Sequence, residues 1–161
     1  MQKITPFLWF NTEAEEAAKF YTSIFKDSKL GSVAPYDEAG AKASGMPAGS
    51  IMVVTFQLNG QDFTAINGGP HFKFNEAVSF VVNCETQEEV DYYWEKLTEG
   101  GDPKAQQCGW LKDKFGLSWQ IVPGIIPQLM QAGGERSKKV MQAVLQMKKI
   151  DIAKVKEAAE K

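Results

Sequence analysis

The sequence predicts an α+β fold built from two βαβββ modules and a C-terminal helical tail. Two segments, residues 4–25 and 78–101, each contain an extended apolar run followed by an amphipathic helix pattern that begins at a threonine. Each of these segments is followed by runs rich in β-forming residues and separated by turn signals. We therefore divide the chain into a first module at 1–72, a second at 73–124 and a tail at 125–161.

The first module begins with the apolar strand ITPFLWFN. Thr12 and Glu15 have the spacing of a capping box, which predicts that a helix begins there. Strands are predicted at 29–36, 50–58 and 61–66, and the Asn59-Gly60 pair between the last two is a strong hairpin signal. The connection at 37–49 is rich in Gly, Ala and Ser.

The second module repeats this order after the turn-rich linker NGGPHFKFNE. Thr86 and Glu89 form a second candidate capping box, and Gly100-Gly101 ends the helix. Strands are predicted at 103–107, in WLKD and in GLSWQIV, with a hairpin turn at Lys114-Phe115-Gly116.

The tail differs in charge from the rest of the chain. From Gly133 to Lys161 it carries eight basic and four acidic residues, and its apolar residues recur at helical intervals. This pattern predicts one or two helices whose apolar stripe packs on the modules or on a second subunit. A nucleic-acid-binding arm is disfavoured, because the net charge is −2 and no aromatic residues interleave with the basic ones.

The composition excludes several classes of protein. No apolar run approaches the ~20 residues that span a bilayer, and no secretory leader is recognisable, so we expect a cytoplasmic protein with neither membrane nor nucleic-acid partners. Two cysteines, Cys84 and Cys108, are predicted to be free, inert thiols. The single histidine, His71, excludes a zinc site with two histidines from one chain.

Four stretches resemble one family in order along the chain: PFLWFNTEAEEAAKFYTSIF, SFVVNCETQEEVDYYWEKLTEGG, CGWLKDKFGLSWQIVP and VMQAVLQMKKIDIAKVKEA. The sequence is similar to the vicinal oxygen chelate superfamily of glyoxalases, bleomycin-resistance proteins and dioxygenases. Within it, the chain most resembles the PhnB-like, 3-demethylubiquinone-9 3-methyltransferase-like branch. This resemblance implies a curved mixed sheet that encloses a cavity, a homodimer, and four inward residues that hold a divalent metal.

The positions that correspond to those four ligands are Thr5, Thr64, Ser79 and Gln120. Hydroxyl and amide groups are poor ligands for a catalytic divalent ion, so we predict no metal and no other cofactor. A register shifted by one residue would place Pro6, Leu8, Phe80 and Trp119 there instead. The chosen register is favoured because it leaves Leu8, Phe10, Phe80 and Val82 in the core.

The predicted function is binding of a small organic ligand in a metal-free cavity. Gln120 and Ser79 would anchor its polar end and Phe7 and Trp9 would stack on its apolar part, with Val81, Val122, Thr5, Thr64 and Ser118 completing the lining. The alternatives are an enzyme with methyltransferase-like, lyase or dioxygenase activity on a quinone or similar aromatic, and a structural or interaction protein. Methyltransferase activity has no support, because no G-x-G turn for S-adenosylmethionine occurs. His71, which Glu76 could orient, is the one candidate general base, although a lone histidine in a glycine-proline loop is more often exposed and inert.

Overall fold

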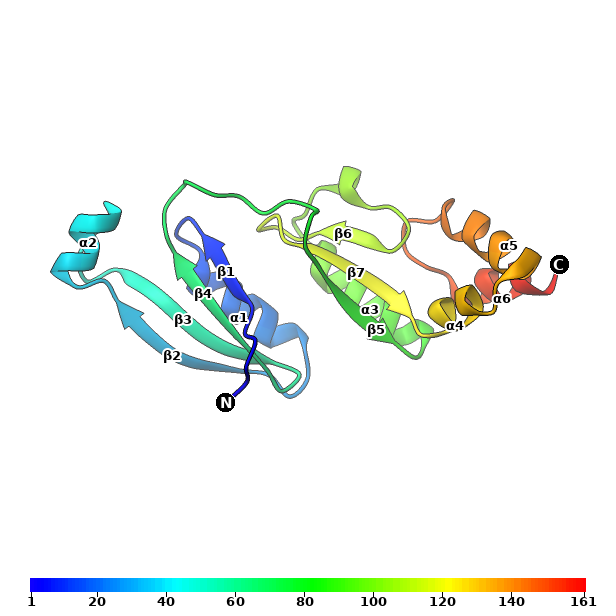
Figure 1. Cartoon of the computed structure of the whole chain (residues 1–161), viewed down its shortest axis with the longest axis horizontal. Helices are drawn as coiled ribbons and strands as arrows, with labels where there is room; N and C mark the ends of the chain where they lie inside the picture. The colour runs from blue at the N-terminus through cyan, green and yellow to red at the C-terminus, as the bar shows by residue number, and fades with distance from the viewer. The chain divides into compact units, whose positions relative to one another are not determined.

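The computed structural model describes residues 1–161 as two compact units, Met1–Phe74 and Asn75–Lys161. Each unit contains one mixed sheet with a long helix against one face (Figure 1). The α+β class predicted from the sequence is confirmed. No helix is long and apolar enough to cross a membrane.

The first unit contains a four-stranded sheet in the order β1-β4-β3-β2. Strand β1 is parallel to β4, and the other pairs are antiparallel. In chain order its elements are β1 (Phe7–Phe10), α1 (Ala14–Ile24), β2 (Lys29–Pro35), α2 (Glu38–Ser44), β3 (Ile51–Leu58) and β4 (Gln61–Asn67). Helix α1 packs on β3 and β4, so Val54, Phe56 and Ala65 are buried beneath it.

The start of α1 differs from the predicted capping box. The side chain of Thr12 makes no cap, and Glu15 forms an ion pair with Lys19 instead. The first helical N–H, that of Ala14, donates to Oδ1 of Asn67 at 2.8 Å. Asn67 is buried on β4 and its Nδ2 also donates to the carbonyl of Ile51. A cap supplied by a strand 53 positions away cannot be read from local spacing.

The second unit contains a three-stranded sheet in the order β5-β7-β6. Its elements are β5 (Ser79–Cys84), α3 (Gln87–Thr98), the 3₁₀ helix η1 (Pro103–Ala105), β6 (Trp110–Lys112) and β7 (Ser118–Pro123). The predicted cap of α3 is confirmed, because Thr86 Oγ1 accepts from the N–H of Glu89.

The strand predicted at 103–107 is wrong. Pro103 begins the 3₁₀ turn, and Asp102 accepts a hydrogen bond from the N–H of Lys104, which holds this turn closed. Only Gln107 makes a β-bridge, to Trp110. The second module therefore has three strands where four were predicted.

The strand register is the same in both units. Phe7 pairs with Thr64 in the first sheet, and its counterpart Val81 pairs with Gln120 in the second. Leu8 and Phe10 are buried, whereas Phe7 is 59% exposed. In β5, Val82 is buried and Val81 is 48% exposed. The chosen register is confirmed, and each sheet has a core face and an open face.

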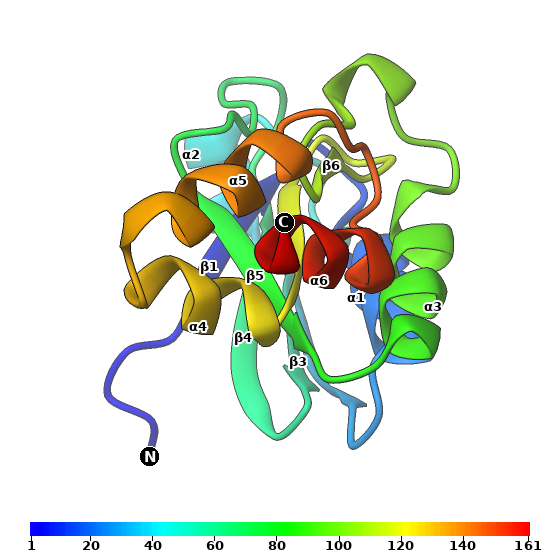
Figure 2. The same cartoon turned by 90° about the vertical axis from the view of Figure 1, so that its right-hand side faces the viewer.

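The tail forms three helices and belongs to the second unit. They are α4 (Ile125–Gln131), α5 (Gly134–Val144) and α6 (Ile152–Glu160), and α5 and α6 lie side by side (Figure 2). Leu129, Val140, Val144, Ile150 and Val155 form their shared core, which also contacts Cys108. The N–H groups of Cys108 and Gly109 donate to the carbonyls of Met147 and Lys148, so the tail stripe is packed within its own chain.

Candidate functional site: a cavity between the second sheet and the tail

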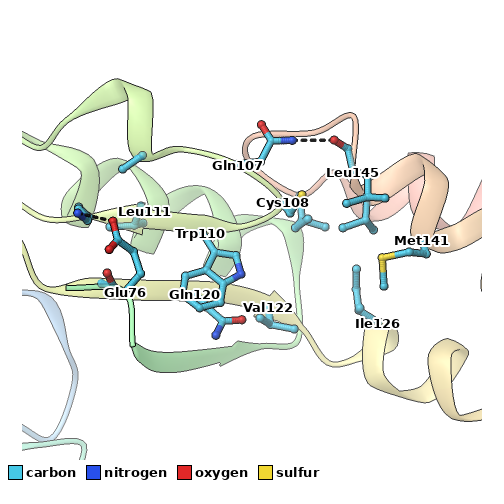
Figure 3. Close-up of a pocket in the computed structure, with 15 residues that line it drawn as sticks. Glu76, Gln107, Cys108, Trp110, Leu111, Gln120, Val122, Ile126, Met141 and Leu145 are labelled. Atoms are coloured by element: carbon cyan, nitrogen blue, oxygen red, sulfur yellow. Dashed lines mark hydrogen bonds and ion pairs between the residues drawn. The ribbon is translucent and has the colours of Figure 1, made fainter. Parts of the chain in front are cut away.

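The second unit contains a cavity of about 690 Å³ on the open face of its sheet (Figure 3). Side chains alternate along β7, so Ser118, Gln120 and Val122 line the cavity, while Trp119 and Ile121 are buried on the α3 side. Strand β6 lines the cavity with all three of its residues, Trp110 and Lys112 on the open face and the buried Leu111 between them.

The tail supplies the opposite, apolar wall of this cavity. Its residues are Ile126 from α4, Met141 and Val144 from α5, and Leu145 and Ile150 from the connection to α6. The Nε2 of Gln107 donates to the carbonyl of Leu145 at 2.7 Å and ties the tail wall to the loop before β6 (Figure 3). Such a hollow, apolar with few polar groups, is typical of small-molecule sites.

The polar groups gather on the sheet side of the cavity. Gln120 donates from Nε2 to Oγ of Ser79 at 2.9 Å. Lys112 forms an ion pair with Glu76, and the Lys112 ammonium holds the pKa of the Glu76 carboxyl below its usual range. The hydroxyl of Ser118 is buried and has no hydrogen-bond partner. A buried polar atom without a partner is rare, so Ser118 is the exceptional group of this site.

The predicted ligand residues fall into two sets. Ser79 and Gln120 are hydrogen-bonded to one another in the second unit. Thr5 and Thr64 line a separate hollow of about 430 Å³ in the first unit, together with Gln2 and Asp62. This hollow and the cavity of the second unit share no residue.

The two predicted aromatic residues differ in their surroundings. Phe7 is exposed on the open face of the first sheet. Trp9 is packed against its own unit, because its Nε1 donates to the carbonyl of Gly69 at 3.0 Å and its ring meets Phe72 edge-on at 4.9 Å. The ring also occupies the space that a Cβ of residue 68 would need, so Gly68 is required there.

His71 lies exposed in the loop after β4. The predicted orienting residue, Glu76, has its carboxylate paired with Lys112. The role of His71 as a general base stays a prediction.

The residues that sequence analysis missed are Trp110, Lys112 and the tail wall. Alternation within WLKD places Trp110 and Lys112 on the face opposite the buried Leu111, so strand periodicity could have found both. Met141 and Leu145 are four residues apart and 39% and 50% exposed, respectively. Helical spacing identifies this pair, but the surface that it faces depends on the fold of the tail.

The metal that the family resemblance implies does not fit these residues. The donors at the four positions are three hydroxyls and one amide, and the amide nitrogen and Ser79 are bonded to one another. Neither unit gathers three or more His, Cys, Asp or Glu side chains in a group that could hold an ion. Divalent catalytic ions select imidazole, carboxylate or thiolate ligands, so we route no chemistry through a metal.

The two cysteines lie in different environments. Cys84 is buried at the end of β5, and burial raises the pKa of its thiol to about 11, with a smaller contribution from the Glu89 carboxylate. A thiol that stays protonated near neutral pH is a poor nucleophile, which agrees with its predicted inertness. Cys108 contributes to the cavity wall.

The sequence profile of the 3-demethylubiquinone-9 3-methyltransferase family matches residues 2–122. The chain belongs to this family. A Bacillus cereus protein named PhnB, provisionally assigned to the same methyltransferase, is 41% identical, with a TM-score of 0.64 over 76% of this chain and 100% of that one. This match confirms the PhnB-like, 3-demethylubiquinone-9 3-methyltransferase-like branch predicted from the sequence. No curated protein matches the chain.

Two more distant structures share the fold. The protein PA1353 from Pseudomonas aeruginosa is 22% identical, with a TM-score of 0.57 over 76% of this chain and 98% of that one. The second is a variant of the fosfomycin resistance protein FosX from Listeria monocytogenes, complexed with Mn(II) and 1S,2S-dihydroxypropylphosphonic acid. It is 16% identical, with a TM-score of 0.53 over 80% of this chain and 98% of that one. These likenesses concern the fold alone.

The family match ends at Val122, at the end of the sheet. The helices α4, α5 and α6 lie beyond it, so the apolar wall of the cavity comes from a part of the chain that the family profile does not include.

Proposed function

We propose that this family member binds a small, largely apolar organic molecule without the help of a metal ion. The observation that carries the proposal is the cavity of about 690 Å³ in the second unit, with its apolar tail wall and few polar groups. Cavities of roughly 300 to 1,000 Å³ with this balance hold drug-sized ligands. The side-chain amide of Gln120, which is hydrogen-bonded to Ser79, orients the polar part of the ligand.

A neutral apolar fluorophore, N-phenyl-1-naphthylamine, tests this proposal. We expect saturable binding of one molecule per cavity, with fluorescence enhancement that chelation by EDTA leaves unchanged. Leu145→Asp places a charge in the tail wall and should weaken binding about tenfold or more, because the bound apolar ligand would cover the carboxylate and remove its water. The matched control is Leu30→Asp, an exposed leucine of the first unit.

Equal binding by both variants, or no saturable binding by the unaltered protein, would reject the proposed site. Elemental analysis of protein purified without a metal-affinity step addresses the metal-free part separately. A stoichiometric content of zinc, nickel, iron or manganese would contradict it.

The methyltransferase activity in the family's description has no matching feature in these residues. A Gly-rich turn between a strand and a helix normally binds S-adenosylmethionine, and the chain has no G-x-G. We therefore favour binding, as in a bleomycin-resistance-like protein, over catalysis on a quinone. Calorimetry with S-adenosylmethionine checks this choice, and micromolar binding would reverse it.

Dimer formation and location are further parts of the proposal. Phe7 is exposed on the open face of the first sheet, which makes this face a candidate surface for a homodimer that light scattering after gel filtration would detect. Two free thiols and the absence of a disulfide favour the cytoplasm. We propose no membrane or nucleic-acid partner.

A further inference from the structure

The cavity changes in polarity along β7. At one end Ser118 pairs across the sheet with Lys112, and in the middle Gln120 pairs with Trp110. At the other end Val122 faces the apolar residues of the tail. Four residues of strand rise by about 13 Å, so the cavity has a polar end and an apolar end separated by roughly the length of a two-ring molecule.

The polar end contains a hydrogen-bonding group that the protein does not use. The Ser118 hydroxyl is 1% exposed and unpartnered, yet its side chain lines the cavity. Folded proteins satisfy the great majority of such buried groups, so an exception beside a cavity indicates that a ligand atom completes it.

The lysine beside Ser118 is the less exposed member of its ion pair. The Lys112 side chain is 27% exposed, whereas that of Glu76 is 64% exposed and lies in the segment before β5. The Glu76 carboxylate can therefore leave into solvent at small cost, while the Lys112 ammonium stays at the cavity. An anion that enters the cavity would take the place of Glu76.

The groups around this end are mainly donors. Lys112 supplies an ammonium and Ser118 a hydroxyl, while Gln120 keeps one amide N–H after its bond to Ser79. A carboxylate has two oxygens that accept several hydrogen bonds and carries the complementary charge. The Trp110 ring lies next to Gln120, where a flat ring of the ligand can stack.

We propose that the ligand is an amphipathic organic acid whose carboxylate binds Ser118 and Lys112 and whose apolar end lies against the tail helices. An aromatic ring of the ligand stacks on Trp110 between these two ends. This inference rests on the proposed function, since it requires the same cavity to bind a small molecule. It adds the chemical class of the ligand and its direction in the site.

The test compares two probes of the same shape, biphenyl-4-carboxylate and biphenyl-4-methanol, by calorimetry at pH 7.5. We expect the acid to bind about tenfold more tightly than the alcohol to the unaltered protein. Lys112→Met and Ser118→Ala should each weaken binding of the acid about fivefold and leave the alcohol nearly unchanged. Glu76→Gln should strengthen binding of the acid, because it removes the competing carboxylate.

The matched control is Lys96→Met, which removes an exposed lysine from α3 on the other side of the sheet. Its affinity for both probes should equal that of the unaltered protein. Circular dichroism and a melting curve for each variant separate loss of binding from loss of fold. Ser118→Ala and Lys112→Met both keep the apolar part of the side chain, which favours folding.

The outcomes distinguish this inference from the proposed function. Equal affinities of acid and alcohol, unaltered by Lys112→Met, would overturn the inference and leave the apolar binding site standing. Tighter binding of the alcohol would also overturn it. If neither probe binds, nor N-phenyl-1-naphthylamine, the proposed function fails and the inference with it.

Discussion

The two units share one strand register but differ in how they satisfy the same position. Thr64 of the first unit and Gln120 of the second occupy corresponding positions. Asp62 and Ser118, two residues earlier in each unit, therefore correspond as well. In the first unit the backbone of Asp62 bonds to the Gln2 side chain in both directions, and its carboxylate accepts from Gln57 at 2.6 Å. In the second unit the Ser118 hydroxyl has no partner.

The difference shows what each open face is built to do. In the first unit the N-terminal residue Gln2 hydrogen-bonds to Asp62, so these polar groups, which line the hollow, have partners within the unit. In the second unit the tail lines an apolar cavity, and the Ser118 hydroxyl beside this cavity has no partner. A duplicated module has thus kept its pairing geometry while only one copy has the features of a ligand site.

The largest expected effect concerns the hairpin turns. Asn59-Gly60 turns the first hairpin with its own backbone, at φ values of 50° and 78°. The second turn is held by buried Asp113, which accepts from the N–H groups of Phe115 and Leu117 and from Nε1 of Trp119. Asp113→Ala should lower the free energy of unfolding by about 4 kcal/mol, because it leaves these donors without a partner.

Urea denaturation measures this loss. The control is Asn59→Ala, which should cost about 1 kcal/mol because only a local left-handed backbone conformation becomes less favourable. Equal losses for the two variants would contradict the difference between the turns.

The helix caps should differ by less. Asn67→Ala removes the buried cap of α1 and the bond to Ile51, and we expect a loss of about 2 to 3 kcal/mol. Thr86→Ala removes an exposed cap from α3 and should cost about 1 kcal/mol. Thermal melts of both variants check the order, and a larger loss for Thr86→Ala would show that local capping dominates in both units.

A third pair concerns the glycines that follow β4 and β7. Gly68→Ala would place its Cβ 2.1 Å from the Trp9 ring, so we expect a loss of about 2 kcal/mol as the ring is displaced. Its counterpart Gly124 has only the Cys84 carbonyl within reach, at 3.8 Å, and Gly124→Ala should change stability by less than about 0.5 kcal/mol. Tryptophan fluorescence should shift for the first variant alone.

The smallest effect is an alkaline one confined to the second unit. The folded pKa of Cys84 is raised to about 11 from 9.0, so the folded state keeps a proton that the unfolded state loses. The free energy of unfolding is therefore unaffected by this thiol below pH 9 and decreases as the pH rises to 11. At pH 10 the decrease is about 1 kcal/mol. In the first unit the corresponding residue is Phe10, which does not titrate.

Unfolding measured at pH 8 and pH 10 for the unaltered protein and for Cys84→Ala isolates this contribution. The variant should lose less stability between the two pH values. An identical pH dependence would show that the thiol is not desolvated in the folded state.

Patterns local in sequence determined most of the fold. Strand alternation was sufficient to separate the core residues Leu8 and Val82 from the exposed Phe7 and Val81, since the period of two is a property of the extended backbone itself. The repeat predicted which strands correspond, and the threonine spacing predicted the cap of α3.

Tertiary structure decided what depends on residues far apart in the chain. The cap of α1 comes from Asn67. The backbone hydrogen bond from the N–H of Cys108 to the carbonyl of Met147 joins the tail to the loop before β6. Ser118 has no partner because long-range packing brings no donor or acceptor of the protein within hydrogen-bond distance of its hydroxyl. The sequence by itself determined most of the strands and their faces, whereas the cavity exists because long-range packing brought the tail to the second sheet.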